Sequence, residues 1–290
     1  MTRSALLACA FALGLGLGLG ASAVAAPPTL PLDPDTLQPN RVRAVYEPPK
    51  DPKHQAIHDR LRQRRVLERV AEFLAPFRLP RDVTMRVLGC DGTANAYYQE
   101  AVITVCYEYI AYLNDFTPNE PLPGGLSADD AVIGPTVDVF LHEFGHAVFD
   151  LLQLPVLGRE EDAADLFSAY TQLMIDREEA RMLIVGTAFL GRREMQEMMR
   201  QSLQIKDYAK EHGLPAQRHF TMLCIAYGFD PVLFADAVTH WNLPPERAEG
   251  CEEEYEQLDR AYRTLILPYM DAALLAQVRA RKWLRFEPQP

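Results

Sequence analysis

Residues 137–149 read VDVFLHEFGHAVF, an apolar segment interrupted by two histidines and a few acidic residues. His142 and His146 lie four residues apart, which places them on one face of an α-helix, one turn from each other. Both imidazoles can therefore reach a single metal ion. We expect a helix over residues 130–153 that carries this H-E-x-x-H pattern.

Glu143 gives the pattern a possible chemical role. A zinc ion held by three protein ligands keeps an open position, where it lowers the pKa of a bound water to about 7 and polarises a carbonyl group. Glu143 follows the first histidine and can take a proton from that water. The alternative is a core helix whose histidines are satisfied by hydrogen bonds, but burying such groups unpaired costs several kcal/mol. The sequence favours one Zn²⁺ bound by His142 and His146, with Glu143 as general base.

A third ligand is expected from the next acidic segment, because residues 159–165 read REEDAAD. Glu161 and Asp165 lie one helical turn apart, so Glu161 can bind the ion while Asp165 accepts the second N–H of a metal-bound imidazole. Asp162, Asp165 and Glu160 are alternative ligands. A solvated acidic helix start, favoured by the helix dipole, is the competing interpretation.

Strands are expected early in the chain and helices late. Apolar and polar residues alternate over residues 83–88, 95–98 and 102–106, which predicts three short strands of one sheet. Apolar spacing predicts a helix over residues 54–77 and, after a loop at residues 117–128, helices over residues 130–153, 160–176, 178–190, 192–211, 217–227, 231–241 and 245–277. This order predicts an α+β class with a single domain over residues 54–290.

The N-terminus has the features of a secretory signal. Residues 1–25 combine Arg3, a long apolar run and the small residues Ala23-Val24-Ala25, which is typical of a cleaved signal peptide. A membrane anchor is the alternative, but the apolar run is short for a span of about 20 residues. We therefore expect an exported protein, periplasmic or secreted, without stable membrane insertion. Residues 26–53 are rich in proline and are expected to form an extended leader.

Four cysteines follow the signal segment: Cys90, Cys106, Cys224 and Cys251. An even number in an oxidising compartment indicates two disulfides, and four cysteines allow three pairings. We favour the pairing of neighbours in sequence, Cys90 with Cys106 and Cys224 with Cys251. A cysteine metal site is the rival interpretation, but no pair has C-x-x-C spacing.

The charge balance argues against a nucleic-acid partner. The chain of 290 residues has 29 basic and 40 acidic side chains and a formal net charge of −11. Neutralising phosphates requires clustered Lys and Arg. An apolar content of 48% excludes a disordered chain.

The two motifs together resemble the gluzincin metallopeptidases, the thermolysin-like group. Asn95-Ala96-Tyr97-Tyr98 agrees, because it is similar to the edge strand with which those enzymes hold a peptide. The resemblance implies a zincin-like fold, a sheet packed on the active-site helix, and substrate binding by Asn95 and the Ala96 backbone. From about residue 55 onward the chain is also similar to a family of exported bacterial proteins classed as metallopeptidases without a known substrate.

The chain departs from the thermolysin-like pattern in two respects. The spacing from His146 to Glu161 is shorter than in those enzymes, which implies a reduced loop beside the pocket. No tyrosine lies between His146 and Glu161 to stabilise an oxyanion, and developing charge needs a donor held near about 3 Å. His219, Tyr227 and His240 are the candidates for that role. His54, His58 and His212 lie in polar surroundings and receive no role.

These observations predict an exported zinc-dependent metallopeptidase that hydrolyses a peptide or protein. The alternative is a zinc-stabilised periplasmic binding or maturation protein with an inactive peptidase-like site. The intact Glu143 is the sequence feature that speaks against it, because a structural metal site has no use for a base.

Overall fold

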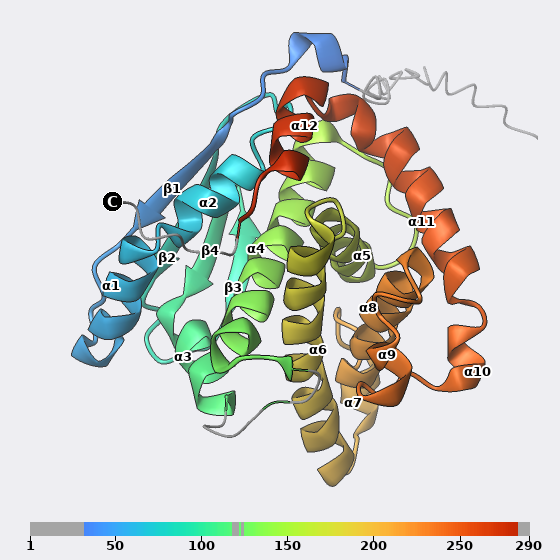
Figure 1. The fold of residues 1–290 in the computed structure, drawn as a ribbon. Helices are drawn as coiled ribbons and strands as arrows, with labels where there is room; N and C mark the ends of the chain where they lie inside the picture. Colours follow the sequence, from blue (N-terminus) through green and yellow to red (C-terminus); the bar gives the residue numbers. More distant parts are fainter. Residues whose placement is uncertain (1–31, 118–121, 123–124, 284–290) are drawn as a thin grey trace, which may run out of the picture.

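A computed structural model describes residues 32–117, 122 and 125–283 (Figure 1). The expected signal peptide, residues 1–25, lies outside the described residues. Within them the class is α+β, with a small sheet and a mostly helical remainder, as predicted. The described helices include none that is long and apolar enough to cross a membrane.

The sheet has four strands, β1 (Val42–Tyr46), β2 (Val83–Leu88), β3 (Ala96–Gln99) and β4 (Val102–Cys106), in the order β1-β2-β4-β3. β1, β2 and β4 are parallel, and β3 pairs antiparallel with β4 at one edge. The three expected strands are confirmed. The fourth, β1, comes from the proline-rich leader, which therefore joins the sheet instead of standing apart from it. Its residues 42–46 contain no proline, so every backbone N–H remains available for pairing.

The long helix α4 (Ala128–Leu152) lies at the centre of the molecule. It begins at Ser127, whose side chain accepts from the Asp130 backbone N–H in a reciprocal capping box. In Figure 1 the sheet lies on one side of α4, and α5 (Glu160–Gln172) and α6 (Arg177–Arg200) lie on the other. Phe144 of α4 packs edge-on against Phe77 at 5.0 Å between ring centres, deep in the core. Because of this central position, α4 contacts the sheet on one side and α5 and α6 on the other.

The other helices differ from the prediction mainly in where one helix ends and the next begins. The helix expected over residues 54–77 is divided at Arg65, which has φ 51°, into α1 (Gln55–Gln63) and α2 (Val66–Phe73). The two helices expected over residues 178–211 are instead the single α6 and a short α7 (Ile205–Tyr208). The remaining helices are α3 (Tyr107–Phe116), α8 (Pro215–Phe229), α9 (Asp236–Thr239), α10 (Pro245–Ala248), α11 (Cys251–Leu265) and α12 (Ala272–Ala280).

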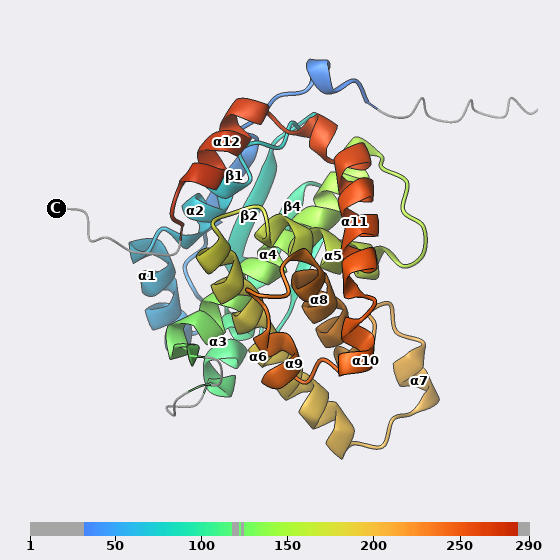
Figure 2. The ribbon, with the colours of Figure 1, turned by 45° about the vertical axis from the view of Figure 1, so that its right-hand side comes forward.

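The C-terminal helices close the helical side. Figure 2 shows α11 and α12 passing over this side of the molecule towards α2. Arg281 pairs with Glu72 of α2 at 2.8 Å, and the Trp283 ring meets Phe73 at 6.0 Å. Residues more than 200 positions apart in sequence therefore lie together.

Both predicted disulfides are confirmed. Cys90–Cys106 joins the loop after β2 to the end of β4. Cys224–Cys251 joins α8 to the start of α11. Such links restrict the unfolded chain and so stabilise the packing of the elements they join.

Candidate active site

Helices α4 and α5 approach closely at Gly145. A Cβ at this position would lie 3.1 Å from the Phe167 ring and 3.3 Å from the Ala164 Cα atom. Because glycine has no Cβ, the second turn of α5 can lie against the middle of α4. This contact places Glu161 opposite His142 and His146.

Three donor atoms converge where the helices meet. Nε2 of His142 lies 3.0 Å from Oε2 of Glu161 and 3.3 Å from Nε2 of His146, and the His146–Glu161 distance is 3.5 Å. Ligands at about 2.1 Å from a tetrahedral zinc ion lie about 3.4 Å from one another. The three atoms therefore fit one face of a zinc coordination tetrahedron without rearrangement.

The other nitrogen of each imidazole is held by a carboxylate. Nδ1 of His142 lies 2.8 Å from Oδ1 of Asp165, and Nδ1 of His146 lies 2.7 Å from Oε1 of Glu160. A carboxylate accepts from Nδ1–H, which leaves the Nε2 lone pair free to bind a metal. Carboxylates therefore orient both rings with Nε2 facing Glu161.

Asp165 is also tied to α8. Arg218 donates from Nε and Nη2 to the two Asp165 oxygens, at 2.7 Å each. Burial acts to raise the pKa of Asp165, but the hydrogen bonds from Arg218 and His142 hold it well below its usual range. Asp165 thus remains an anion beside His142.

The electrostatics of the cluster favour a cation. Burial acts to lower the pKa of His142, yet its hydrogen bonds to Asp165 and Glu161 raise that pKa to about 9. The hydrogen bond to His142 lowers the pKa of Glu161 to about 2. The carboxylates of Asp165 and Glu161 therefore stabilise a positive charge on His142. The same two carboxylates would attract a metal ion to this position.

Glu143 lies on the sheet side of this cluster, and its side chain is nearly buried at 7% exposure. Burial raises the pKa of Glu143, while the neighbouring histidines act to lower it. A carboxylate with a raised pKa is suited to accept a proton and then return it. Glu143 lines both cavities that open from the cluster.

The outer cavity is an open cleft of about 640 Å³. One wall is Asn95 and the edge strand β3, and the other includes His146, Glu161 and His212. An edge strand offers unpaired backbone groups to an extended peptide. The structure therefore brings Asn95 and Ala96, both singled out from the sequence, to the margin of the cluster.

His212 also lies at the cluster, although no motif in the sequence singles it out. Its Nε2 lies 2.8 Å from Oε2 of Glu161, and its ring stacks on His142 at 5.8 Å. His142, Glu161 and His212 can offer ligand atoms within 4.8 Å of one another. His212 lies in the segment between α7 and α8, where neighbouring lysine and glutamate residues make it resemble any exposed histidine.

The three candidates for oxyanion stabilisation lie elsewhere or point elsewhere. His219 is buried, and its Nε2 is hydrogen-bonded to the Trp241 carbonyl oxygen at 2.9 Å. Tyr227 and His240 line neither the outer nor the inner cavity. The structure brings His212, and none of these three, into contact with Glu161.

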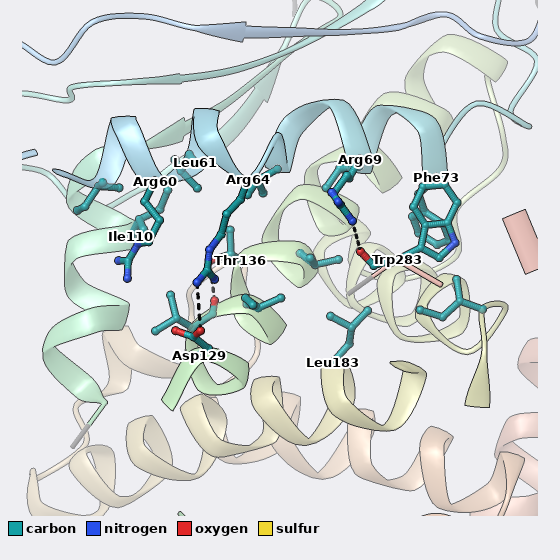
Figure 3. A pocket seen from close by; sticks show the side chains of 17 residues that line it. Arg60, Leu61, Arg64, Arg69, Phe73, Ile110, Asp129, Thr136, Leu183 and Trp283 are labelled. Atoms are coloured by element: carbon teal, nitrogen blue, oxygen red, sulfur yellow. Dashed lines mark hydrogen bonds and ion pairs between the residues drawn. The ribbon is translucent and has the colours of Figure 1, made fainter. Parts of the chain in front are cut away.

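A separate apolar cavity of about 100 Å³ lies between α1 and α2 on one side and α4 and α6 on the other (Figure 3). Leu61, Phe73, Leu183 and Trp283 form part of its wall. Its one acidic residue, Asp129, is paired with Arg64, and no histidine or cysteine lines it. Among the described residues, the histidines and carboxylates that could hold a metal ion therefore gather at the α4–α5 contact and not in this cavity.

Comparison with known proteins agrees with this geometry. A protein-family model described as "Putative metallopeptidase" matches residues 46–266, which include both motif segments and all four paired cysteines. No curated protein and no solved structure matches the chain.

Proposed function

The chain belongs to this metallopeptidase family, since the match covers well over half of its length, and we propose that it is an exported zinc peptidase of zincin-like architecture. Family membership supplies the reaction class, a peptide or protein substrate and the need for a metal ion. The proposal adds zinc, a single ion, and the roles of individual residues. Two disulfides are compatible with an oxidising, extracytoplasmic compartment.

The observation that carries the proposal is the triangle of His142 Nε2, His146 Nε2 and Glu161 Oε2, with edges of 3.0 to 3.5 Å. Two imidazoles and one carboxylate are a ligand set of catalytic zinc sites, which leave a fourth position open. Asp165 and Glu160 hold the two rings in the orientation that zinc requires.

Glu143 acts as the base in this proposal. A bound zinc ion would polarise the substrate carbonyl and acidify a water molecule. Glu143 takes the proton as that water attacks and later gives it to the leaving amine. Its nearly buried position beside the metal ligands keeps bulk water from competing for the proton.

His212 and β3 position and stabilise the substrate. His212 lies across from Glu143 in the outer cleft, half-exposed, with Nε2 directed at the ligand cluster. From there it can donate a hydrogen bond to the oxygen that becomes negative during attack. The edge of β3, with Asn95 and Ala96, holds the peptide backbone antiparallel.

The test is the substitution Glu143→Gln in zinc-loaded protein, with a peptide-library digest as the assay. Loss of the base should lower hydrolysis by at least about a hundredfold, while zinc content measured by elemental analysis stays at one ion per chain. Full activity of this variant would refute Glu143 as the base. One bound zinc ion without cleavage of any peptide by the unmodified protein would favour the alternative, a zinc-stabilised binding protein.

A further inference from the structure

The inner cavity leads from the ligand cluster into the protein between α4, α6 and α8. It has a volume of about 230 Å³, and His142 and Glu143 stand at its opening to the cluster. Val139, Leu190 and Met222 give it apolar walls. An engineered cavity of about 150 Å³ accommodates benzene, so this space is large enough for an unbranched side chain.

Two carboxyl groups line this cavity without a cationic partner. Asp138 comes from α4 and Glu194 from α6. The ion pairs among the described residues include none that joins either group to a lysine, arginine or histidine. Burial raises the pKa of both carboxyls, and the nearby positive charge of Arg218 offsets this effect only in part.

Neither Asp138 nor Glu194 uses all of its hydrogen-bond acceptor sites. Oδ1 of Asp138 accepts from Ser168 Oγ at 2.7 Å and from Gln172 Nε2 at 2.8 Å. Among the described residues, the Tyr112 hydroxyl is the only group within hydrogen-bond distance of Glu194. Its oxygen lies 3.4 Å from Oε1. A carboxylate offers about four acceptor sites, so most of this capacity is unused.

Arg218 is the arginine on the cavity wall, and it already forms an ion pair with Asp165. Its Nε and Nη2 atoms both donate to Asp165, the residue that orients His142. This two-point pairing neutralises Asp165 and fixes the guanidinium plane. Arg218 acts on Asp138 and Glu194 through its charge, but among the described residues it forms an ion pair with neither.

His219 borders the cavity but offers it no accessible ligand atom. It is only 2% exposed, and its Nε2 donates to the Trp241 carbonyl oxygen. Its Nδ1 is a buried nitrogen that lies against Gly191, 3.0 Å from the place where a Cβ would stand. The acceptors that the cavity presents are therefore the two carboxyl groups.

Both carboxyl groups are acceptors, so the matching ligand must be a donor with positive charge. We propose that the inner cavity binds the ammonium group of a lysine-like side chain, carried by a substrate residue next to the scissile bond. In this proposal Val139, Leu190 and Met222 contact its methylene groups, and Asp138 and Glu194 accept hydrogen bonds from its N–H groups. This inference rests on the proposed peptidase function and specifies its substrate class.

The experiment begins with zinc-loaded protein and a reduced, unfolded protein as substrate, with cleavage sites read by mass spectrometry. The best-cleaved sequence is then made as three peptides with lysine, norleucine or glutamate at the flanking position. We expect kcat/KM for lysine to exceed that for norleucine by about tenfold or more, since a hydrogen bond to a charged group is worth at least that factor. Equal or better cleavage of the norleucine peptide would overturn the proposal.

Variants then assign the preference to the cavity. Glu194→Gln should remove most of the advantage of lysine, measured as the ratio of kcat/KM for the lysine peptide to kcat/KM for the norleucine peptide. Glu197→Gln is the matched control, because Glu197 lies on the same helix but pairs with Arg200 at the surface. A thermal melt of each variant establishes that it is folded. A lysine preference that survives in both Glu194→Gln and Asp138→Asn would refute the assignment.

A binding measurement separates this inference from the proposed function. Calorimetry with the Glu143→Gln protein should show tighter binding of the lysine peptide than of the norleucine peptide, and Glu194→Gln in that background should abolish the difference. If the lysine peptide binds more tightly in this way but the unmodified protein cleaves no peptide, the inner cavity is a lysine-binding site and the proposed peptidase function is refuted. Cleavage with no preference for charge would sustain the peptidase and refute the cavity.

Discussion

Nδ1 of His142 lies 2.8 Å from Oδ1 of Asp165, on the opposite side of the ring from Glu161. This contact keeps a proton on Nδ1, because an ionised carboxylate can only accept. Nε2 is therefore the nitrogen that can exchange its proton for a metal ion in the proposed site. Asp165 therefore acts on the metal through His142, as a positioning residue.

Replacing Asp165 by Asn should weaken zinc binding by about 10- to 100-fold, the usual effect of losing such an outer partner. An amide can accept from Nδ1–H, but it lacks the charge that strengthens His142 as a ligand and no longer pairs with Arg218. Competition with a chromophoric chelator measures the affinity. Asp162→Asn is the control, since Asp162 lies on the same helix, bonded to Arg159 at the surface. Equal affinity in the two variants would contradict the role of Asp165.

Much of the site could be predicted from the sequence because its geometry is local. His142, Glu143 and His146 lie within two turns of one helix, and Glu161 and Asp165 within two turns of the next. Helical spacing alone places each set on one face. The close approach of the two helices depends on Gly145, whose role is visible only in the packing.

The parts that were missed depend on contacts between distant segments. His212 reaches Glu161 across a separation of 51 positions, and nothing in its own neighbourhood marks it. Asp138 and Glu194 face one cavity although they belong to different helices. Strand β1 was missed for a similar reason, since its residues pair with residues of β2 that lie 41 positions later. Periodicity detects elements, and it does not detect which elements meet.

Zinc should bind once per chain and stabilise the fold. At a free zinc concentration of about 100 times the Kd, a ligand that binds only the folded state adds about 2.7 kcal/mol of stability. His142→Ala, His146→Ala and Glu161→Ala should each remove the zinc-dependent rise in Tm. His240→Ala is the control, because His240 is exposed and lines neither cavity of the site. A metal-dependent Tm that survives in His146→Ala would exclude the proposed ligand set.

His212→Ala should lower kcat by about 100- to 1,000-fold, the range seen when an oxyanion donor is lost. Zinc affinity should change little, because the three ligands of the proposed site remain. His212→Gln, which keeps an N–H donor, should recover part of the activity. Elemental analysis beside kinetics distinguishes this role from that of a fourth ligand: loss of zinc from His212→Ala would make His212 a ligand.

The buried carboxyl of Glu194 should make stability depend on pH. Burial raises its pKa in the folded protein, so the folded state holds the proton more strongly than the unfolded state. Its contribution to stability is therefore greatest in acid and is lost as pH rises through the folded pKa. Glu194→Gln should match the unmodified protein at about pH 4 and exceed it at about pH 8, where a gain of about 1 kcal/mol raises Tm by about 2–4 °C. Melts of the zinc-free proteins test this, and equal Tm differences at both pH values would contradict it.

The crossing of α4 and α6 sets the width of the inner cavity, and it depends on a pair of glycines. A Cβ at Gly186 would lie 2.4 Å from the Asp130 carbonyl oxygen and 3.1 Å from the Gly134 Cα atom. Gly186→Ala must therefore push the helices apart, at a cost of about 1–3 kcal/mol for an overpacked core, and should shift Asp138 and Glu194 relative to each other. Gly250→Ala is the control, because no atom lies within 4 Å of its Cβ position. Denaturant unfolding should show a loss of stability for Gly186→Ala and none for Gly250→Ala. If Gly186→Ala also reduces the preference for the lysine peptide, the crossing of α4 and α6 contributes to substrate selection.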